Sequence, residues 1–152
     1  MIGISGIPGS GKSSVCDALR KLGYGCRNVL ELEGALSCLD GEEMDVECLR
    51  ERLSRAGERD IIVEGHYSHL LGPSAVFILE RDEEKVAETL RGRGYSDEKI
   101  NENLDALRSD IIYQESLEFL PSSRIHRIRV QEGDTEATAN KILQFLNPAK
   151  KD

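Results

Sequence analysis

The chain has 152 residues, of which 39% are apolar and 32% charged, and this composition is typical of one soluble globular domain rather than a disordered chain. The formal net charge of −8 argues against a broad surface for duplex nucleic acid, which needs many phosphate contacts, although a few local cations suffice for a nucleotide. No apolar run approaches the ~20 residues of a membrane span and no charged-then-apolar leader opens the chain, so we expect a cytoplasmic protein without a membrane partner.

Apolar runs of strand type alternate with helical patterns along the chain, without a repeat, a low-complexity tract or a linker. This alternation predicts a single domain over residues 1–152, with a parallel sheet and helices on both of its faces. The expected strands cover residues 2–5, 25–29, 60–64, 75–79 and 126–130. The third and fourth strands contain nearly continuous apolar runs, as strands buried on both faces require.

Helix signals fall between the expected strands. The first helix is expected over about residues 11–22 with Gly23 as its C-cap, and one long helix from about residue 96 to residue 119, just before Pro121. Shorter helices are expected over residues 83–90, around residues 46–53 and from about residue 135. The helix starts are marked by side chains that can accept a hydrogen bond from the first turn, namely Asp45, Asp82, Ser96 and either Asp134 or Thr135.

The four cysteines are spaced ten to twelve residues apart and form no C-x-x-C pair; they are Cys16, Cys26, Cys38 and Cys48. This spacing does not favour a metal site or a redox motif. We therefore expect free thiols in a reducing compartment.

Residues 6–13 read Gly-Ile-Pro-Gly-Ser-Gly-Lys-Ser and fit G-x-x-x-x-G-K-[ST], the phosphate-binding P-loop. A short apolar strand precedes the motif and a helix follows it, so the backbone N–H groups and the helix dipole can surround an anion. Lys12 can then reach the β- and γ-phosphates, and the Ser13 hydroxyl can bind Mg²⁺. The alternative is a glycine-rich turn with a chance lysine. The expected phosphate-binding residues are Gly6, Gly9, Ser10, Gly11, Lys12, Ser13 and Ser14.

A second chemical element follows the third expected strand, which ends in Glu64. Ligands of such sheets bind beyond the carboxyl ends of the strands, and a carboxylate there can hold Mg²⁺ directly or through water. The alternative is a glutamate that merely faces solvent. His66 could orient water or a substrate phosphate, or it could be a hydrogen-bonded loop histidine.

A third element is cationic: Arg91 and Arg93 lie on a glycine-rich connection between two expected helices. A guanidinium group matches phosphate oxygens and can stabilise the negative charge that spreads over a transferring phosphoryl group. The alternative is a solvated basic turn that offsets neighbouring acids.

With these motifs the sequence resembles the adenylate kinase superfamily, and more closely its archaeal and nuclear branch, the adenylate kinase isoenzyme six family. The P-loop is the first matching feature, and Val-Glu-Gly-His at residues 63–66 is similar to the branch's Asp-x-His Walker B signature. The third feature is Arg-Gly-Tyr at residues 93–95 with the helix that follows. The resemblance covers essentially the whole chain, although residues 28–56 match only loosely.

The resemblance implies a P-loop NTPase fold of three layers, α/β/α, with a five-stranded parallel sheet of order 2-3-1-4-5. It also implies a monophosphate-binding insertion at about residues 28–51 and a short LID at about residues 92–102. The implied activity is Mg²⁺-dependent transfer of a phosphoryl group from ATP to a nucleoside monophosphate, chiefly AMP. By position, Arg93 would be the LID arginine on the nucleotide, and Glu64 with His66 the Walker B pair. Gly9, Gly11, Lys12, Ser13 and Ser14 would bind the phosphates and magnesium.

Members of the branch are also described as ATPases that assist late maturation of the small ribosomal subunit, through transient binding of a small-subunit ribosomal protein. Three functional hypotheses therefore stand: a nucleoside monophosphate kinase, an ATPase-driven assembly factor with little kinase activity, and a small-metabolite kinase. No acceptor-binding motif beyond the family resemblance supports the third.

Two departures from the family pattern concern the acceptor and the metal. Glu64 replaces the Walker B aspartate and is longer by one methylene. The larger adenylate kinases hold the acceptor phosphate with an arginine of a Gly-Phe-Pro-Arg turn, whereas residues 65–69 of this chain contain no arginine. Arg27, Arg50 and Arg52 are candidate replacements, and the sequence does not choose among them.

Overall fold

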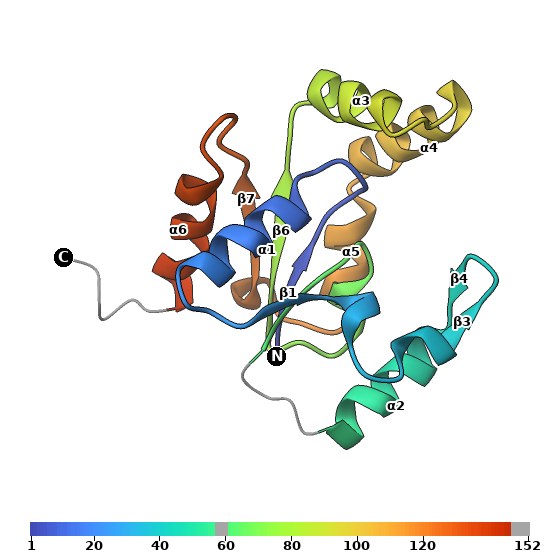
Figure 1. The fold of residues 1–152 in the computed structure, drawn as a ribbon, viewed down its shortest axis with the longest axis vertical. Coiled ribbons are helices and arrows are strands. Elements are labelled where there is room, and N and C mark those ends of the chain that lie inside the picture. The colour runs from blue at the N-terminus through green and yellow to red at the C-terminus, as the bar shows by residue number, and fades with distance from the viewer. Residues whose placement is uncertain (57–60, 147–152) are drawn as a thin grey trace.

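A computed structural model describes residues 1–56 and 61–146 of the chain (Figure 1). Its centre is a five-stranded parallel sheet in the order β2-β5-β1-β6-β7. These strands are β1 (Ile2–Ser5), β2 (Cys26–Asn28), β5 (Ile62–Glu64), β6 (Ala75–Glu80) and β7 (Ile125–Arg129). Counted along the chain, the sheet order is 2-3-1-4-5, which confirms the predicted topology. The first part of the predicted strand 60–64, residue 60, lies outside the described residues.

Helices cover both faces of this sheet and confirm the three-layer arrangement. On one face, α1 (Lys12–Lys21) and α6 (Thr135–Leu146) lie side by side. On the other face, α5 (Ile111–Leu117) covers β6 and β7, while α2 (Val46–Ala56) belongs to an apolar cluster that includes Val63 of β5. Within the described ranges, no helix has both the length and the apolar character that crossing a membrane would require.

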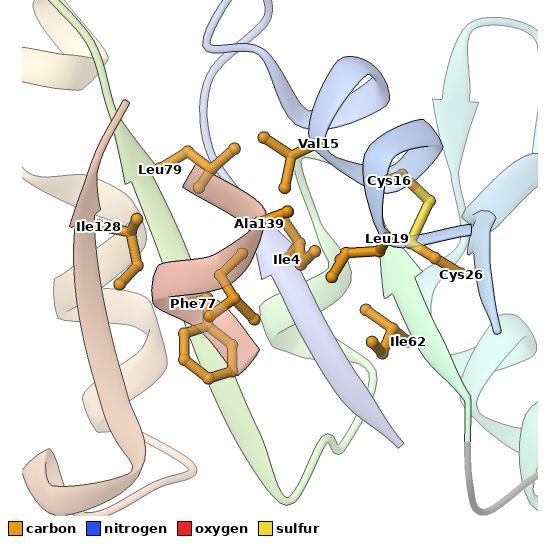
Figure 2. Packing of buried hydrophobic residues seen from close by; sticks show 11 residues of the cluster. Ile4, Val15, Cys16, Leu19, Cys26, Ile62, Phe77, Leu79, Ile128 and Ala139 are labelled. Carbon is orange, nitrogen blue, oxygen red and sulfur yellow. A yellow bond between two sulfur atoms is a disulfide. The ribbon is translucent and has the colours of Figure 1, made fainter. Parts of the chain in front are cut away.

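The main core lies between the sheet and the α1/α6 layer (Figure 2). Ile4 and Phe77 come from the two central strands, and Val15 and Leu19 meet them from α1; all four side chains are at most 1% exposed. Because side chains alternate along a strand, Val76 and Ile78 of β6 point to the opposite face and pack below α5. The near-continuous apolar run of β6 thus reflects burial on both faces.

Two further helices, α3 (Glu83–Gly92) and α4 (Asp97–Arg108), extend beyond the carboxyl edge of the sheet (Figure 1). They pack on the P-loop through Ile7, which shares a buried cluster with Val86 and Leu90 of α3 and Ile100 and Leu104 of α4. Their connection contains only Arg93 to Ser96, so Arg93 is fixed at a helix end beside the P-loop.

A small hairpin was not predicted from the sequence: β3 (Leu39–Asp40) pairs with β4 (Glu43–Met44) between β2 and α2. Short 3₁₀ helices, η1 (Val29–Glu31) and η2 (Ala35–Cys38), precede it, and η3 (Ser68–Leu70) and η4 (Ser122–Arg124) lie elsewhere in the chain. The predicted caps of Asp45, Asp82 and Ser96 are confirmed, since each side chain accepts a backbone N–H from the first turn of its helix. Asp134 caps α6 through the N–H of Ala137.

The prediction of free cysteines is wrong, because Cys16 is bonded to Cys26 and Cys38 to Cys48. Each pair spans ten residues, and the Cα atoms lie 5.5 and 5.6 Å apart, inside the normal range for a disulfide. Figure 2 shows the first bond joining α1 to β2, where the chain returns antiparallel to the helix. A motif search for nearby cysteines misses such pairs, because the packing of α1 on β2 joins the first pair and the packing of η2 on α2 joins the second. Because the cysteines are bonded, they no longer support the inference of a reducing compartment. Disulfides do not exclude such a compartment either, since intracellular proteins of hyperthermophiles can be disulfide-rich.

The prediction of one long helix to residue 119 is also wrong, because the chain breaks at Asp110 between α4 and α5. Asp110 adopts the left-handed conformation, with φ of +58°, which a short polar side chain tolerates better than most. Its carboxylate accepts a hydrogen bond of 2.8 Å from Arg127 of β7. The apolar periodicity continues across residue 110, so this pattern does not mark the break.

Candidate active site

The P-loop connects β1 to α1 and presents backbone N–H groups toward the carboxyl edge of the sheet. Gly9 and Gly11 have φ values of +81° and +99°, which L side chains rarely adopt, so glycine is required at both turns. Gly11 is the N-cap of α1 without a side-chain cap. Within the described part of the chain, the N–H groups of Gly11, Lys12 and Ser13 have no acceptor. These groups at a helix N-terminus make a site for a phosphate.

Lys12 folds back over this loop and is 9% exposed. Its ammonium donates hydrogen bonds of 2.9 and 2.8 Å to the carbonyls of Gly6 and Ile7, and it lies 3.5 Å from the hydroxyl of Ser10. Burial lowers the pKa of Lys12 from 10.5 to about 8; the carboxylate of Glu64 opposes this shift, and the positive charge of Arg93 adds to it. A bound phosphate would supply the negative charge that this buried ammonium lacks.

Glu64 ends β5 and is 3% exposed. Its Oε1 accepts a hydrogen bond of 3.3 Å from the Ser13 hydroxyl and one of 2.7 Å from the Asn28 side-chain amide. The register of the parallel strands brings the Glu64 and Asn28 side chains together, because Glu64 pairs with Asn28 of β2 on one side and with Ile4 of β1 on the other. The carboxylate therefore stands beside the first turn of α1, and the solvent-facing alternative for Glu64 is excluded.

The residue after Glu64 needs to be small. A Cβ on Gly65 would lie 2.8 Å from a methyl group of Val29, which follows Asn28 in the chain. Any larger side chain would push the start of η1 away from the end of β5. The close approach of these two strand ends keeps Asn28 and Glu64 together.

The residues at this edge fit a magnesium ion in their chemistry. Ser13 and Glu64 offer a hydroxyl and a carboxylate oxygen within hydrogen-bond distance of each other. Mg²⁺ prefers oxygen ligands and usually retains several waters beside one or two carboxylates and the substrate phosphates. No group of three or more His, Cys, Asp or Glu ligands that could hold a metal is found in the part of the chain that the structure describes. A resident all-protein metal cage therefore has no support in these residues.

His66 lies in the loop after Glu64 and is exposed. Its ring meets Tyr67 edge-on at 4.5 Å, and partial burial together with the charge of Lys12 lowers its pKa. A neutral imidazole on this loop can accept or donate a hydrogen bond to a phosphate or to water.

Arg93 lines a cavity of about 310 Å³ together with Gly9, Gly11 and Ser14 of the P-loop side. The opposite wall is formed by the β7–α6 loop, residues 130–133. Arg91 does not line this cavity; it lies exposed in the last turn of α3, and no ion pair of its side chain is found in the described ranges. The structure thus brings one of the two predicted arginines to the P-loop.

Arg81 is a site residue that the sequence analysis missed. Its guanidinium donates to the carbonyl of Gly9 at 2.9 Å and to the hydroxyl of Thr89 at 2.7 Å, and it pairs with Glu132 at 2.6 Å. It therefore ties the P-loop to α3 and to the β7–α6 loop around the same cavity. The rule that selected Glu64, a polar residue directly after a buried strand, would also have selected Arg81 after β6.

A buried polar network lies below the P-loop. The hydroxyl of Ser5 and Nδ1 of His69 are 2.9 Å apart, and Nε2 of His69 is 3.3 Å from the carboxylate of Glu115. The residue types match a hydrolase triad, but Ser5 is 0% exposed, so no substrate can reach its oxygen. Burial lowers the pKa of His69, while Glu115 opposes the shift. The network joins α5 to the end of β1 and supports the loop.

Most of the net negative charge lies in the segment of residues 28–51. This 28–51 segment contains eight acidic residues and one basic residue, Arg50, against a net charge of −8 for the whole chain. The guanidinium of Arg50 already has partners within the protein. It donates a hydrogen bond of 2.6 Å to the carbonyl of Leu70, and its Cζ lies 4.9 Å from the centre of the Phe119 ring. Arg27 lies on the face of β2 opposite Asn28, as alternation requires.

Arg52 is the remaining candidate for an acceptor phosphate. It makes no hydrogen bond or ion pair with any residue in the described ranges. Its side chain lies against the backbone of Gly34, where a Cβ would come within 3.0 Å of the guanidinium. Of the three arginines left open by the sequence, Arg52 is thus the one on α2 whose charge is uncompensated.

A larger cleft of about 790 Å³ lies between the ends of β6 and β7 and the helices α4 and α5. Two of the arginines that line it are already paired: Arg127 binds Asp110 and Glu80, and Arg108 binds Glu83. Arg127 also lies 4.0 Å from the ring of Tyr113. The arginines at residues 108 and 127 therefore serve packing rather than a ligand.

Known proteins match this chain over nearly its whole length. A profile of the family described as "AAA domain" matches residues 2–110. A "Putative adenylate kinase" of Thermoplasma acidophilum is 49% identical over 146 residues, which cover 96% of this chain and 97% of that protein. A protein of the same name from Archaeoglobus fulgidus is 40% identical and covers 96% of this chain and 79% of its own length.

Among solved structures, a shikimate kinase from Acinetobacter baumannii in complex with shikimate has a TM-score of 0.63 at 17% identity, covering 99% of this chain and 94% of that one. At this identity the likeness concerns the fold alone. The archaeal relatives add the sequence evidence, because at 49% and 40% identity each of them matches 96% of this chain. The chain therefore belongs to the family that the AAA-domain profile describes and to the adenylate kinase family of its archaeal relatives.

Proposed function

We propose that this kinase transfers the γ-phosphate of ATP to AMP or a related nucleoside monophosphate. The observation that carries the proposal is the meeting of Lys12, Ser13 and Glu64 at one edge of the sheet, with Ser13 3.3 Å from Glu64. A P-loop lysine, a hydroxyl and an acid in this arrangement match the needs of phosphoryl transfer, which depends on positioning and electrostatics.

The ATP phosphates would lie on the N–H groups at the start of α1, with the nucleoside in the cavity beside Arg93. Lys12 would exchange the carbonyls of Gly6 and Ile7 for phosphate oxygens. Arg93 would bring positive charge to the transferring group from the α3–α4 connection. When bound by Ser13 and Glu64, Mg²⁺ would supply further positive charge to the phosphate oxygens. Glu64 and His66 would orient the attacking group, and Arg91 would act only if α3 moves.

The acceptor would bind under the 28–51 segment, with Arg52 on its phosphate. Arg52 supports this role because, among the described residues, its side chain makes no hydrogen bond or ion pair. The eight acids of the segment would oppose a free anion, so we expect a weak acceptor site that depends on this one guanidinium. Closure of the short LID, proposed for residues 92–102, would exclude water as a competing acceptor.

An acceptor panel tests the proposal. The purified protein is incubated with ATP and Mg²⁺, and ADP formation is measured with each nucleoside monophosphate, with shikimate and with water alone. We expect AMP or a related monophosphate to raise ADP formation well above the rate with water. Equal rates with every compound and with water would leave only an ATPase.

A second candidate function is an ATP-driven assembly factor for the small ribosomal subunit, which would bind a ribosomal protein transiently. The acidic 28–51 segment favours it, because Leu30 and Leu36 are 42% and 65% exposed among those acids. Such a surface is complementary to a basic partner with apolar anchors. Capture of ribosomal proteins from lysate with and without ATP tests this function. Equal capture under the two conditions would count against partner binding that is controlled by ATP. Both roles agree with a cytoplasmic location.

A further inference from the structure

The side chain of Asn28 is held at both ends. Its Oδ1 accepts a hydrogen bond of 2.8 Å from the N–H of Leu30, and its Nδ2 donates one of 2.7 Å to Oε1 of Glu64. The first bond makes Asn28 the N-cap of η1. Because a backbone N–H can bond only to the oxygen of the amide, this bond also determines which end of the amide faces Glu64.

The carboxylate of Glu64 is correspondingly asymmetric. Its Oε1 receives two donors, from Asn28 and Ser13, whereas Oε2 receives none within the described residues. No described side-chain oxygen is both fully buried and without a partner, so Oε2 retains access to solvent. A carboxylate that is 3% exposed needs such donors in place of the water that burial removes.

We propose that Asn28 is a positioning residue for the metal-binding carboxylate. It holds Oε1 of Glu64 against the start of α1 and thereby directs Oε2 toward the phosphate site. The inference rests on the proposed function in one respect, the assignment of Glu64 to Mg²⁺. Hydrogen bonds to a ligating carboxylate are the usual means by which proteins orient it.

The same contact links two parts of the molecule. Asn28 is the first residue of the 28–51 segment, and its cap fixes the first turn of that segment at Leu30. Glu64 belongs to the sheet beside the P-loop. The metal carboxylate and the proposed acceptor side thus share one side chain, and a displacement of the segment would move the donor of Glu64.

Two substitutions separate the roles of Asn28. Asn28→Asp keeps an oxygen for the N–H of Leu30 but replaces the donor to Glu64 by a second carboxylate oxygen. Asn28→Ala removes both. Asn103→Asp is the matched control, because the amide of Asn103 also donates through Nδ2, to the carbonyl of Lys99 on the exposed side of α4.

The measurement is ADP binding by calorimetry, once with Mg²⁺ and once with EDTA. In Asn28→Asp and Asn28→Ala we expect the gain in ADP affinity caused by Mg²⁺ to fall about 10-fold or more, with affinity in EDTA unchanged. We also expect kcat to fall by roughly 10- to 100-fold at little change in the KM for ATP. A merely structural role would weaken ADP binding in EDTA as well.

The outcomes separate the two claims. An unchanged Mg²⁺ gain in Asn28→Asp, or an equal loss in Asn103→Asp, overturns the role of Asn28 and leaves the proposed function intact. If the unmodified protein binds ADP no better with Mg²⁺ than with EDTA, the assignment of Glu64 fails instead. If Asn28→Ala does not fold, Asn28→Asp decides alone, because it retains the cap.

Discussion

The P-loop side and the 28–51 segment differ in how their charges are arranged. At the P-loop, Lys12 and Arg93 are close enough for the charge of Arg93 to lower the pKa of Lys12, and neighbouring strands fix Glu64 and Asn28. The 28–51 segment has eight acids and a single arginine, and Arg50 is bound to a carbonyl. The P-loop side has the groups that bind a polyphosphate, whereas on the other side we expect the acceptor to depend on Arg52, for which no ion pair is found among the described residues.

The difference indicates where specificity resides. A preformed N–H cradle binds the phosphates of any nucleoside triphosphate with little rearrangement. An acidic segment offers an anionic acceptor few favourable contacts, so the choice of acceptor depends on Arg52 and on closure. Substitutions on the two sides should therefore change different kinetic constants.

The largest effect is expected from Lys12→Ala. Loss of the ammonium over the P-loop should lower kcat by about 10³-fold or more, because it removes charge from the transferring group. Phosphoryl transfer from ATP is the measurement. Lys21→Ala, at the exposed end of α1, is the control and should leave the rate unchanged.

Arg93→Ala should lower kcat by roughly 10²- to 10³-fold with a much smaller change in ATP affinity, because the charge is needed most in the transition state. Arg91→Ala is the natural comparison, since Arg91 lies outside the cavity. Steady-state kinetics of both variants decide the matter. Equal rates for Arg93→Ala and the unmodified enzyme would remove Arg93 from the mechanism.

Removal of each disulfide should destabilise the protein, but only one of the two bonds should affect acceptor binding. Replacing either pair by serine should lower the free energy of unfolding by about 2–4 kcal/mol, since each bond closes a short loop in the unfolded chain. The Cys16–Cys26 bond lies in the core beside the P-loop, and the Cys38–Cys48 bond lies within the 28–51 segment. Urea unfolding measures both losses. Only the loss of Cys38–Cys48 should also raise the KM for the acceptor, and a larger change in the KM for ATP would contradict the division.

Arg52→Ala should raise the KM for the acceptor by about 10-fold, the loss of one charge-assisted phosphate contact in a partly exposed site. The KM for ATP should stay constant. Arg50→Ala is the control on the same helix, and its effect should fall on stability through the lost contact with Leu70. An unchanged acceptor KM in Arg52→Ala would exclude Arg52 as the ligand of the acceptor phosphate and leave Arg27 as the remaining candidate.

A smaller effect concerns pH. The pKa of Lys12 is about 8 in the folded protein and 10.5 for an ordinary lysine, so the buried ammonium costs stability below pH 8, and this cost is relieved as the pH rises toward 10.5. Bound phosphate raises the pKa again, so ATP binding near pH 8 to 9 should take up a proton. Calorimetry in two buffers of different ionisation enthalpy measures this uptake. Lys12→Ala should abolish it.

Features coded by neighbouring residues could be predicted from the sequence. The P-loop, the alternation of strands with helices and the caps at Asp45, Asp82 and Ser96 each depend on residues a few positions apart. Glu64 was found because a buried strand delivers it to the sheet edge. These signals sufficed for the topology and for the centre of the site.

Features that depend on contacts between distant segments could not be predicted in this way. The Cys16–Cys26 bond joins α1 to β2, the Cys38–Cys48 bond joins η2 to α2, and Asp110 at the helix break contacts Arg127 of β7. Asn28 ends the edge strand β2 and Arg81 follows the buried strand β6, but their partners, Glu64 and Glu132, lie 36 and 51 residues away. A polar residue at a strand end indicates that a site is near; the register of the sheet decides its partner.

The most direct test follows the γ-phosphate itself. ATP labelled with ³²P at the γ-position is mixed with excess enzyme, Mg²⁺ and AMP, and the products are separated over time. We expect the label to move into the β-position of ADP, and to enter inorganic phosphate slowly when AMP is omitted. Label that remains in ATP under both conditions, or that enters only inorganic phosphate when AMP is present, would contradict the proposed phosphoryl transfer.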